Sequence, residues 1–214
     1  MGTPIVTVDN VVSEIAGHPV HAPVSLQLAA AQLGVLTGGN GSGKTSLLRA
    51  ISGELRITSG SVRICGEAVR FGSTWRLTRS FLRMIPQFPM HPPDLTIREY
   101  LNGWYLCRPV SSWDVNLGRV TEELEEITGH SRHTALGTLS HGQRRLVDIR
   151  LSLYARPQLL LADEPLAGLS QQRLDWCVAL LGEFRRQGGT LLVVAHTAER
   201  HLWNADCTCE VFPI

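Results

Sequence analysis

The chain has 214 residues, of which 43% are hydrophobic and 18% are charged, and its formal net charge is +1. This composition supports a folded core and argues against intrinsic disorder, and the small net charge gives no broad basic field, so no nucleic-acid partner is expected. The five cysteines lack the spacing of a zinc or redox site, and we expect neither a secretory signal nor a membrane-spanning segment.

The first third of the chain alternates between strand and turn patterns. Residues from about Ile5 to Leu28 and from Gly60 to Phe71 predict an antiparallel, β-rich edge. Between them, Gly34 to Thr37 is typical of a short buried strand, and Thr45 to Ser52 has the apolar spacing of a helix. A strand, a loop and a helix are therefore expected in direct succession.

The loop between that strand and helix reads GGNGSGKT, which is the GxxxxGK[ST] pattern of a phosphate-binding loop. Its glycines let successive backbone N–H groups converge on a polyphosphate at the N-terminus of the helix. Lys44 is the one lysine among the twenty basic residues of the sequence, and its compact ammonium group suits a position between β- and γ-phosphates. The hydroxyl of Thr45 is expected on Mg²⁺. The predicted nucleotide-binding residues of this loop are Gly38, Gly39, Asn40, Gly41, Ser42, Gly43, Lys44, Thr45 and Ser46.

Two acidic residues follow a second apolar run. Leu159 to Ala162 is typical of a strand buried on both faces, and Asp163 and Glu164 come directly after it. Adjacent acids at a strand end are common in solvated turns, but a phosphate-binding loop upstream favours a functional interpretation. We therefore expect Asp163 to hold Mg²⁺ and Glu164 to act as the general base that activates water.

A third segment, LSHGQ at Leu139 to Gln143, precedes residues 144–151, which have helical apolar spacing. GGNGSGKT, LSHGQ and LLLADEP, in this order, resemble the ATP-binding subunit of an ATP-binding cassette (ABC) transporter over essentially the whole chain. The resemblance implies one α/β domain over residues 1–214. This domain would have a P-loop NTPase core, an antiparallel β edge subdomain and an inserted helical subdomain at about 90–155.

In that family the LSGGQ signature binds the γ-phosphate of ATP held by the opposite subunit. The resemblance carries this role to Ser140, His141, Gly142 and Gln143, with His141 in place of the first signature glycine. It implies that two ATPase subunits, as a homodimer or a heterodimer, sandwich two ATP molecules.

Two further catalytic residues are expected from the resemblance. Gln87 stands where the family has a glutamine that senses Mg²⁺ and the attacking water, so we expect it to contribute both to catalysis and to the metal site. His196 follows the buried-type strand Thr190 to Ala195 and matches the switch histidine that contacts the γ-phosphate.

The chain departs from the family pattern in two places. No Phe, Trp or Tyr precedes Phe71, so the aromatic residue that stacks on adenine is missing. An aliphatic or imidazole side chain near Ile15 to Val20 is expected to cover the base instead, which predicts weaker discrimination between ATP and GTP. Ser170 replaces a common aspartate, which predicts altered coupling between the two sites without loss of hydrolysis.

Aromatic and methionine side chains gather in the segment after Gln87, namely Phe88, Met90, Tyr100, Trp104 and Tyr105. In ABC subunits this surface receives a helix of the permease, and such anchors suit a docking pocket. The alternative for Trp104 and Tyr105 is that they pack the small core of the helical insertion.

The sequence thus predicts an ATP-hydrolysing subunit that powers transport through a separate integral membrane permease and lies at the cytoplasmic face of the membrane. One alternative is a soluble ABC ATPase that acts on ribosomes or DNA, although such proteins usually carry tandem cassettes. Another is a P-loop kinase or a nucleotide-regulated binding module. The compact size resembles haem-export ATPases and the LSHGQ spelling resembles branched-chain amino acid and urea importers, so cargo and direction stay open.

Overall fold

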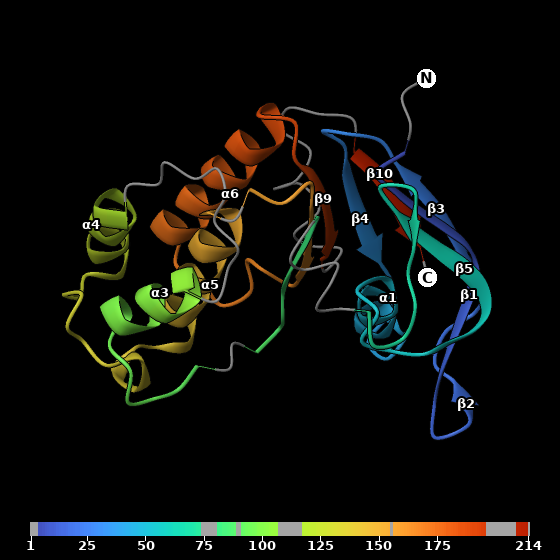
Figure 1. The fold of residues 1–214 in the computed structure, drawn as a ribbon, viewed down its shortest axis with the longest axis horizontal. Helices are drawn as coiled ribbons and strands as arrows, with labels where there is room; N and C mark the ends of the chain where they lie inside the picture. Colours follow the sequence, from blue (N-terminus) through green and yellow to red (C-terminus); the bar gives the residue numbers. More distant parts are fainter. Residues whose placement is uncertain are drawn as a thin grey trace.

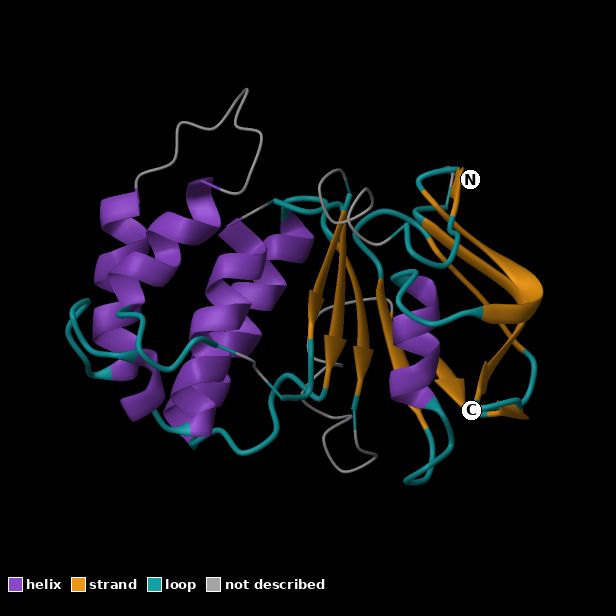
Figure 2. Cartoon of the chain, turned by 60° about the horizontal axis from the view of Figure 1, so that its bottom comes forward, coloured by secondary structure: helices purple, strands orange, loops and turns teal. Residues whose placement is uncertain are grey.

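The computed structural model describes residues 4–73, 81–88, 91–106, 117–154, 156–195 and 209–213. Its elements form an antiparallel sheet, a parallel sheet and a group of helices, arranged as successive layers across the molecule (Figures 1 and 2). The strands are β1 Val6–Ile15, β2 His18–Pro19, β3 Val24–Leu28, β4 Leu33–Thr37, β5 Ile57–Ile64, β6 Glu67–Ala68, β7 Leu82–Ile85, β8 Leu159–Asp163, β9 Thr190–Val194 and β10 Cys209–Pro213. The helices are α1 Lys44–Ile51, α3 Ile97–Leu106, α4 Leu117–Thr128, the short 3₁₀ helix η1 Leu136–Thr138, α5 His141–Tyr154 and α6 Gln171–Arg186.

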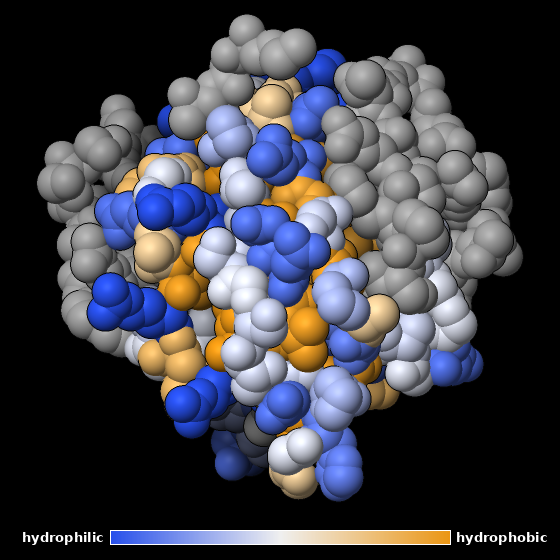
Figure 3. Space-filling view, turned by 90° about the vertical axis from the view of Figure 1, so that its right-hand side faces the viewer, coloured by the Kyte–Doolittle hydropathy of each residue, from blue (hydrophilic) through white to orange (hydrophobic). Residues whose placement is uncertain are grey.

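The antiparallel sheet forms the edge that the sequence predicts. Its strand order is β2-β1-β5-β6, with β3 paired to β1, and β5 begins at Ile57, a little earlier than expected. Val8 and Val62 are register partners and are buried, whereas Asp9 and Ser61 are partners on the opposite, exposed face. The side of the molecule that carries this sheet accordingly shows hydrophilic residues mixed with hydrophobic ones (Figure 3).

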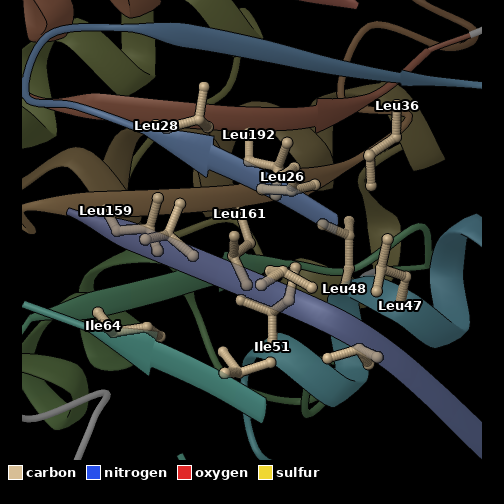
Figure 4. Packing of buried hydrophobic residues seen from close by; sticks show 14 of the residues in the cluster. Leu26, Leu28, Leu36, Leu47, Leu48, Ile51, Ile64, Leu159, Leu161 and Leu192 are labelled. Atoms are coloured by element: carbon tan, nitrogen blue, oxygen red, sulfur yellow. The ribbon is translucent and has the colours of Figure 1, made fainter. Parts of the chain in front are cut away.

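The parallel sheet has the order β10-β4-β9-β8-β7 and is covered on both faces. Alternate residues of β8 face opposite cores: Leu159 and Leu161 pack toward α1 and the antiparallel sheet, whereas Leu160 and Ala162 pack toward α5 and α6. Figure 4 shows the first core, in which the leucines of α1 lie between the two sheets. This burial on both faces explains the continuous apolar run of β8.

The inserted helices have a core of their own. Helix α5 serves two cores, since Leu146 and Ile149 pack against the parallel sheet while Val147 and Leu151 pack with α3 and α4. Helix α3 begins after Thr96, whose backbone N–H and hydroxyl both donate to the carboxylate of Glu99 and so cap the helix. Among the described helices, none is both long and apolar enough to cross a membrane.

Candidate active site

The candidate site lies where parallel strands end side by side. Strands β4, β9, β8 and β7 are consecutive neighbours, so the segments that follow them meet at one edge of the sheet. The phosphate-binding loop follows β4, Asp163 and Glu164 stand at the end of β8, and Gln87 follows β7. His196 follows β9 in the sequence but lies outside the described residues, so its role stays a prediction.

The loop runs directly into α1, which begins at Lys44. Gly43 has a φ of 94°, and a Cβ atom there would stand 2.3 Å from the carbonyl oxygen of Val20 and 2.7 Å from Cβ of His21. Gly41 also has a positive φ, of 80°, but a Cβ there would meet nothing within 4 Å. Gly43 is therefore required both by its backbone conformation and by the close approach of the segment between β2 and β3.

Lys44 is only 7% exposed, and its amine is held inside the loop. Nζ donates to the carbonyl oxygens of Gly38 at 2.9 Å and Gly39 at 2.7 Å, and it lies 3.3 Å from the hydroxyl of Ser42. An ammonium group has three donors, so these bonds occupy the group that would otherwise meet phosphate oxygens. The loop's own carbonyl groups thus fix the position of the Lys44 charge.

Thr45 and Asp163 face each other across the start of α1. The hydroxyl of Thr45 donates to Oδ2 of Asp163 at 2.8 Å. Asp163 is 1% exposed, and burial raises the pKa of its carboxyl group, an effect that the Thr45 hydrogen bond partly offsets. The second oxygen, Oδ1, is buried and has no hydrogen-bond partner among the described residues. A buried, unsatisfied carboxylate oxygen beside a hydroxyl is the donor set that a hard cation such as Mg²⁺ prefers.

Gln87 and Glu164 form a second pair of side chains. The amide Nε2 of Gln87 donates to Oε2 of Glu164 at 3.0 Å. Glu164 has a φ of 47°, in the left-handed region that side-chain-bearing residues seldom adopt, and its N–H donates to the carbonyl of Val194 at 3.1 Å. Such a backbone costs about 1–3 kcal/mol and persists where surrounding contacts fix it, often at functional sites.

Lys44, Thr45, Gln87 and Glu164 share one pocket of about 630 Å³. Its lining residues are Pro19, Val20, Asn40, Gly41, Gly43, Lys44, Thr45, Ser46, Gln87 and Glu164. Pro19 and Val20 fall in the segment that we expected to cover a base, and both are aliphatic. The pocket thus joins the phosphate-binding loop to Gln87 and Glu164, with an apolar wall at one side.

The LSHGQ segment caps α5 and does not line this pocket. The N–H of Ser140 donates to Oε1 of Gln143 at 2.8 Å, and the N–H of Gln143 donates back to the Ser140 hydroxyl at 3.2 Å. These reciprocal bonds are a capping box. The amide of Gln143 also donates to the carbonyl of Thr128 at 2.7 Å, so this side chain anchors the helix to its own chain.

Comparisons with known proteins agree with this geometry. A family model described as ABC transporter matches residues 21–167. The chain belongs to the ABC transporter family. A ribose import ATP-binding protein of Halalkalibacterium halodurans is 28% identical over 207 residues, which cover 91% of this chain and 40% of that protein. A high-affinity branched-chain amino acid transport ATP-binding protein of Pseudomonas aeruginosa is 28% identical over 183 residues, with 86% and 78% covered.

The fold also matches that of a solved structure. A dimeric, post-hydrolysis ATP-binding cassette with bound ADP and phosphate matches with a TM-score of 0.77 at 21% identity, covering 91% of this chain and 89% of that one. The predicted ABC ATPase type of α/β fold is therefore confirmed. The chain spans about 40% of the length of the ribose import relative, so the activity and partners of that whole protein do not transfer directly.

Sequence reasoning missed one residue at this ABC site. Arg145 lies on α5, is 2% exposed, and donates hydrogen bonds to the backbone carbonyls of Gln87 and Glu164. Its Nη2 also lies 3.2 Å from Nε2 of His141, and because an arginine only donates, this contact requires a neutral imidazole. The pKa of His141 is indeed lowered, first by partial desolvation and then by the charges of Arg145 and Arg144. No sequence pattern marks bonds to backbone carbonyls, so this role was not visible.

Ser170, the residue that departs from the ABC pattern, stands at the N-cap position of α6. Its side chain makes no capping hydrogen bond there. The predicted effect of Ser170 on coupling between two ATP sites stays a prediction.

Proposed function

We propose that this chain is the ATP-hydrolysing subunit of an ABC transporter and powers substrate movement through a separate membrane permease. ATP hydrolysis is general in the family to which the chain belongs. One observation carries the assignment to this chain. The Thr45–Asp163 pair and the Gln87–Glu164 pair lie together beside the phosphate-binding loop, so phosphate, metal and water would meet at one place.

The phosphate-binding loop would hold the polyphosphate of ATP. Lys44 would exchange its bonds to the Gly38 and Gly39 carbonyls for phosphate oxygens, and the N–H groups at the start of α1 would face the same charge. Thr45, Asp163 and Gln87 would hold Mg²⁺, and the unsatisfied Oδ1 of Asp163 supports this fit. Bound Mg²⁺ would neutralise charge that develops on the phosphates.

Glu164 would act as the general base. Its carboxylate lines the pocket and would accept a proton from the attacking water, while the amide of Gln87 would hold that carboxylate in place and orient the water. His196 would contact the γ-phosphate from the end of β9, as the family resemblance implies. These assignments give each residue one chemical role that a single substitution tests.

A dimer would complete the site. Ser140 and His141 are exposed, and Gly142 and Gln143 stand with them at the N-terminus of α5; none of the four lines this chain's pocket. This placement favours a role at the nucleotide of a facing subunit, which would be a second copy or a different cassette. The dimeric cassette with a similar fold is consistent with such an arrangement.

The permease would bind beside Gln87. Phe88 is 67% exposed, whereas Tyr100 packs edge-on against His91 with 4.9 Å between ring centroids and joins the helical core. We therefore assign docking to Phe88 and a structural role to Tyr100. Met90 and the side chains of Trp104 and Tyr105 lie outside the described part of the chain. Docking of this kind would hold the protein at the cytoplasmic face of the membrane.

The test uses Glu164→Gln, because removing the base stalls hydrolysis after ATP is bound. The variant, trapped with ATP and Mg²⁺ in membranes of its own cell, is gently purified and its companions are identified by mass spectrometry. Lys44→Ala, which should lose ATP binding, is the matched control. We expect an integral membrane protein in stoichiometric amount with Glu164→Gln and much less of it with Lys44→Ala.

Other outcomes would contradict parts of the proposal. A ribosomal, DNA-repair or purely soluble partner would overturn the transport function and leave the ATPase chemistry standing. Wild-type turnover in Glu164→Gln would show that another residue activates the water. Retained ATP affinity in Lys44→Ala would overturn the assignment of the phosphate-binding loop.

A further inference from the structure

Arg145 is a buried cation whose hydrogen bonds within the described part of the chain all go to uncharged groups. Nη1 donates to the carbonyls of Glu164 and Ala167, the latter at 3.4 Å, and Nη2 donates to the carbonyl of Gln87 and to His141. Burial lowers the pKa of Arg145. Burying a guanidinium group costs free energy, and hydrogen bonds to neutral carbonyls offset that cost only in part. Stability alone therefore does not explain an arginine here.

The carbonyls that Arg145 binds belong to the two residues whose side chains form the Gln87–Glu164 hydrogen bond. Glu164 has a left-handed φ of 47°, a strained conformation that persists only where outside contacts hold it. The hydrogen bond from Arg145 to the Glu164 carbonyl is one such contact. Once the backbone on both sides is fixed, the carboxylate of Glu164 and the amide of Gln87 are directed at each other. Arg145 therefore acts on the reacting groups through their backbone.

The same guanidinium group also reaches the start of α5. It lies one turn into the helix and contacts His141, whose ring stands 5.8 Å from that of the exposed Phe88. One turn further, Asp148 of α5 holds the buried side chain of His91, with 2.7 Å between Oδ1 and Nε2. Helix α5 thus binds Gln87 through Arg145 and His91 through Asp148. A shift of α5 would therefore move Gln87 and the Glu164 peptide with it.

We propose that Arg145 is a positioning residue for ATP hydrolysis, which ties the general base Glu164 and Gln87 to helix α5 and its LSHGQ end. The inference rests on the proposed ATPase function. It implies that the base is correctly directed only when α5 is in place, so a facing subunit or a permease that moves α5 would control hydrolysis through one side chain.

The test compares Arg145→Met and Arg145→Lys with Arg150→Met. Arg150 is on the same helix but pairs with Glu123 of α4 at 2.5 Å, away from the pocket. For both Arg145 variants we expect kcat to fall about 100-fold, because a misplacement near 1 Å costs about that factor. The dissociation constant for ATP should stay within about threefold, since the phosphate-binding loop is untouched. Arg150→Met should keep the wild-type kcat.

Two further measurements separate positioning from a merely structural role. Arg145→Met should remain folded at the assay temperature, as its thermal midpoint would show, and in the Glu164→Gln background it should not slow the residual turnover further. Unchanged kcat in both Arg145 variants, or additive losses in the double variant, would overturn the inference while the ATPase function stands. A wild-type protein that does not hydrolyse ATP would instead refute the proposed function.

Discussion

Replacing Gly43 with alanine tests how tightly the phosphate-binding loop is built against the segment between β2 and β3. The added Cβ would stand 2.3 Å from the carbonyl oxygen of Val20 and would force a side-chain-bearing residue to a φ of 94°. The left-handed backbone costs about 1–2 kcal/mol, and relief of the overlap costs about 1–3 kcal/mol more. We therefore expect Gly43→Ala to lower the free energy of unfolding by about 2–5 kcal/mol.

Gly41→Ala is the matched control, because it has a positive φ of 80° in the same loop but open space around the added Cβ. It should lose only the backbone cost of about 1–2 kcal/mol. Urea denaturation of the nucleotide-free proteins measures both variants, and each kcal/mol should also lower the thermal midpoint by about 2–4 °C for a chain of this size. Equal losses for the two variants would refute the reasoning, since the close approach to Val20 would then carry no cost.

Three other predictions concern recognition of the nucleotide base, the metal site and an ion pair in the helical insertion. GTP should compete with ATP to within about tenfold, or about 1.4 kcal/mol, because Pro19 and Val20 offer an aliphatic wall; a hundredfold preference for ATP in competition binding would indicate base recognition by another group. Asp163→Asn should raise the thermal midpoint of the nucleotide-free protein at neutral pH, because the folded variant no longer buries a carboxylate, whose pKa burial raises. It should also abolish stabilisation by ATP with Mg²⁺, because a proposed metal ligand is lost. In the wild type the unfavourable contribution of Asp163 to stability should shrink as pH falls, and a lower midpoint for the variant would contradict this reasoning. The hydrogen bond from Arg132 lowers the pKa of Glu125 from 4.5 to about 2. The stability difference between the wild type and Glu125→Gln should therefore be complete above about pH 4.5 and disappear as pH falls to about 2. A difference that persists below pH 2 in urea denaturation would show that packing, not charge, is responsible.

The parts of the site that the sequence predicts are those written in local patterns. Strand β4, the glycine-rich loop and α1 follow one another within twenty residues, so turn chemistry and apolar spacing were enough to place them, to within a residue at each end of the helix. Strand β8 was equally visible, because burial on both faces requires an uninterrupted apolar run.

The parts that the sequence could not give depend on backbone geometry brought together by the fold. The left-handed φ of Glu164 and the carbonyl acceptors of Arg145 leave no mark in residue identity, because any residue has a carbonyl group. The capping box of Ser140 and Gln143 does have a sequence signal, the S-x-x-Q spacing at a helix start. It was not predicted, because the LSHGQ segment was interpreted only as a nucleotide-binding signature.

The single lysine makes the phosphate-binding loop a natural spectroscopic site. Because the sequence contains no other lysine, isotopic labelling with ¹⁵N-lysine would place its side-chain signal at Lys44 alone. Lys44 is 7% exposed and its amine donates to two carbonyls of its own loop, so the amine's proton exchange should be slow and its chemical shift should change when phosphate replaces those carbonyls. One resonance would then follow loading and emptying of the loop without any introduced label.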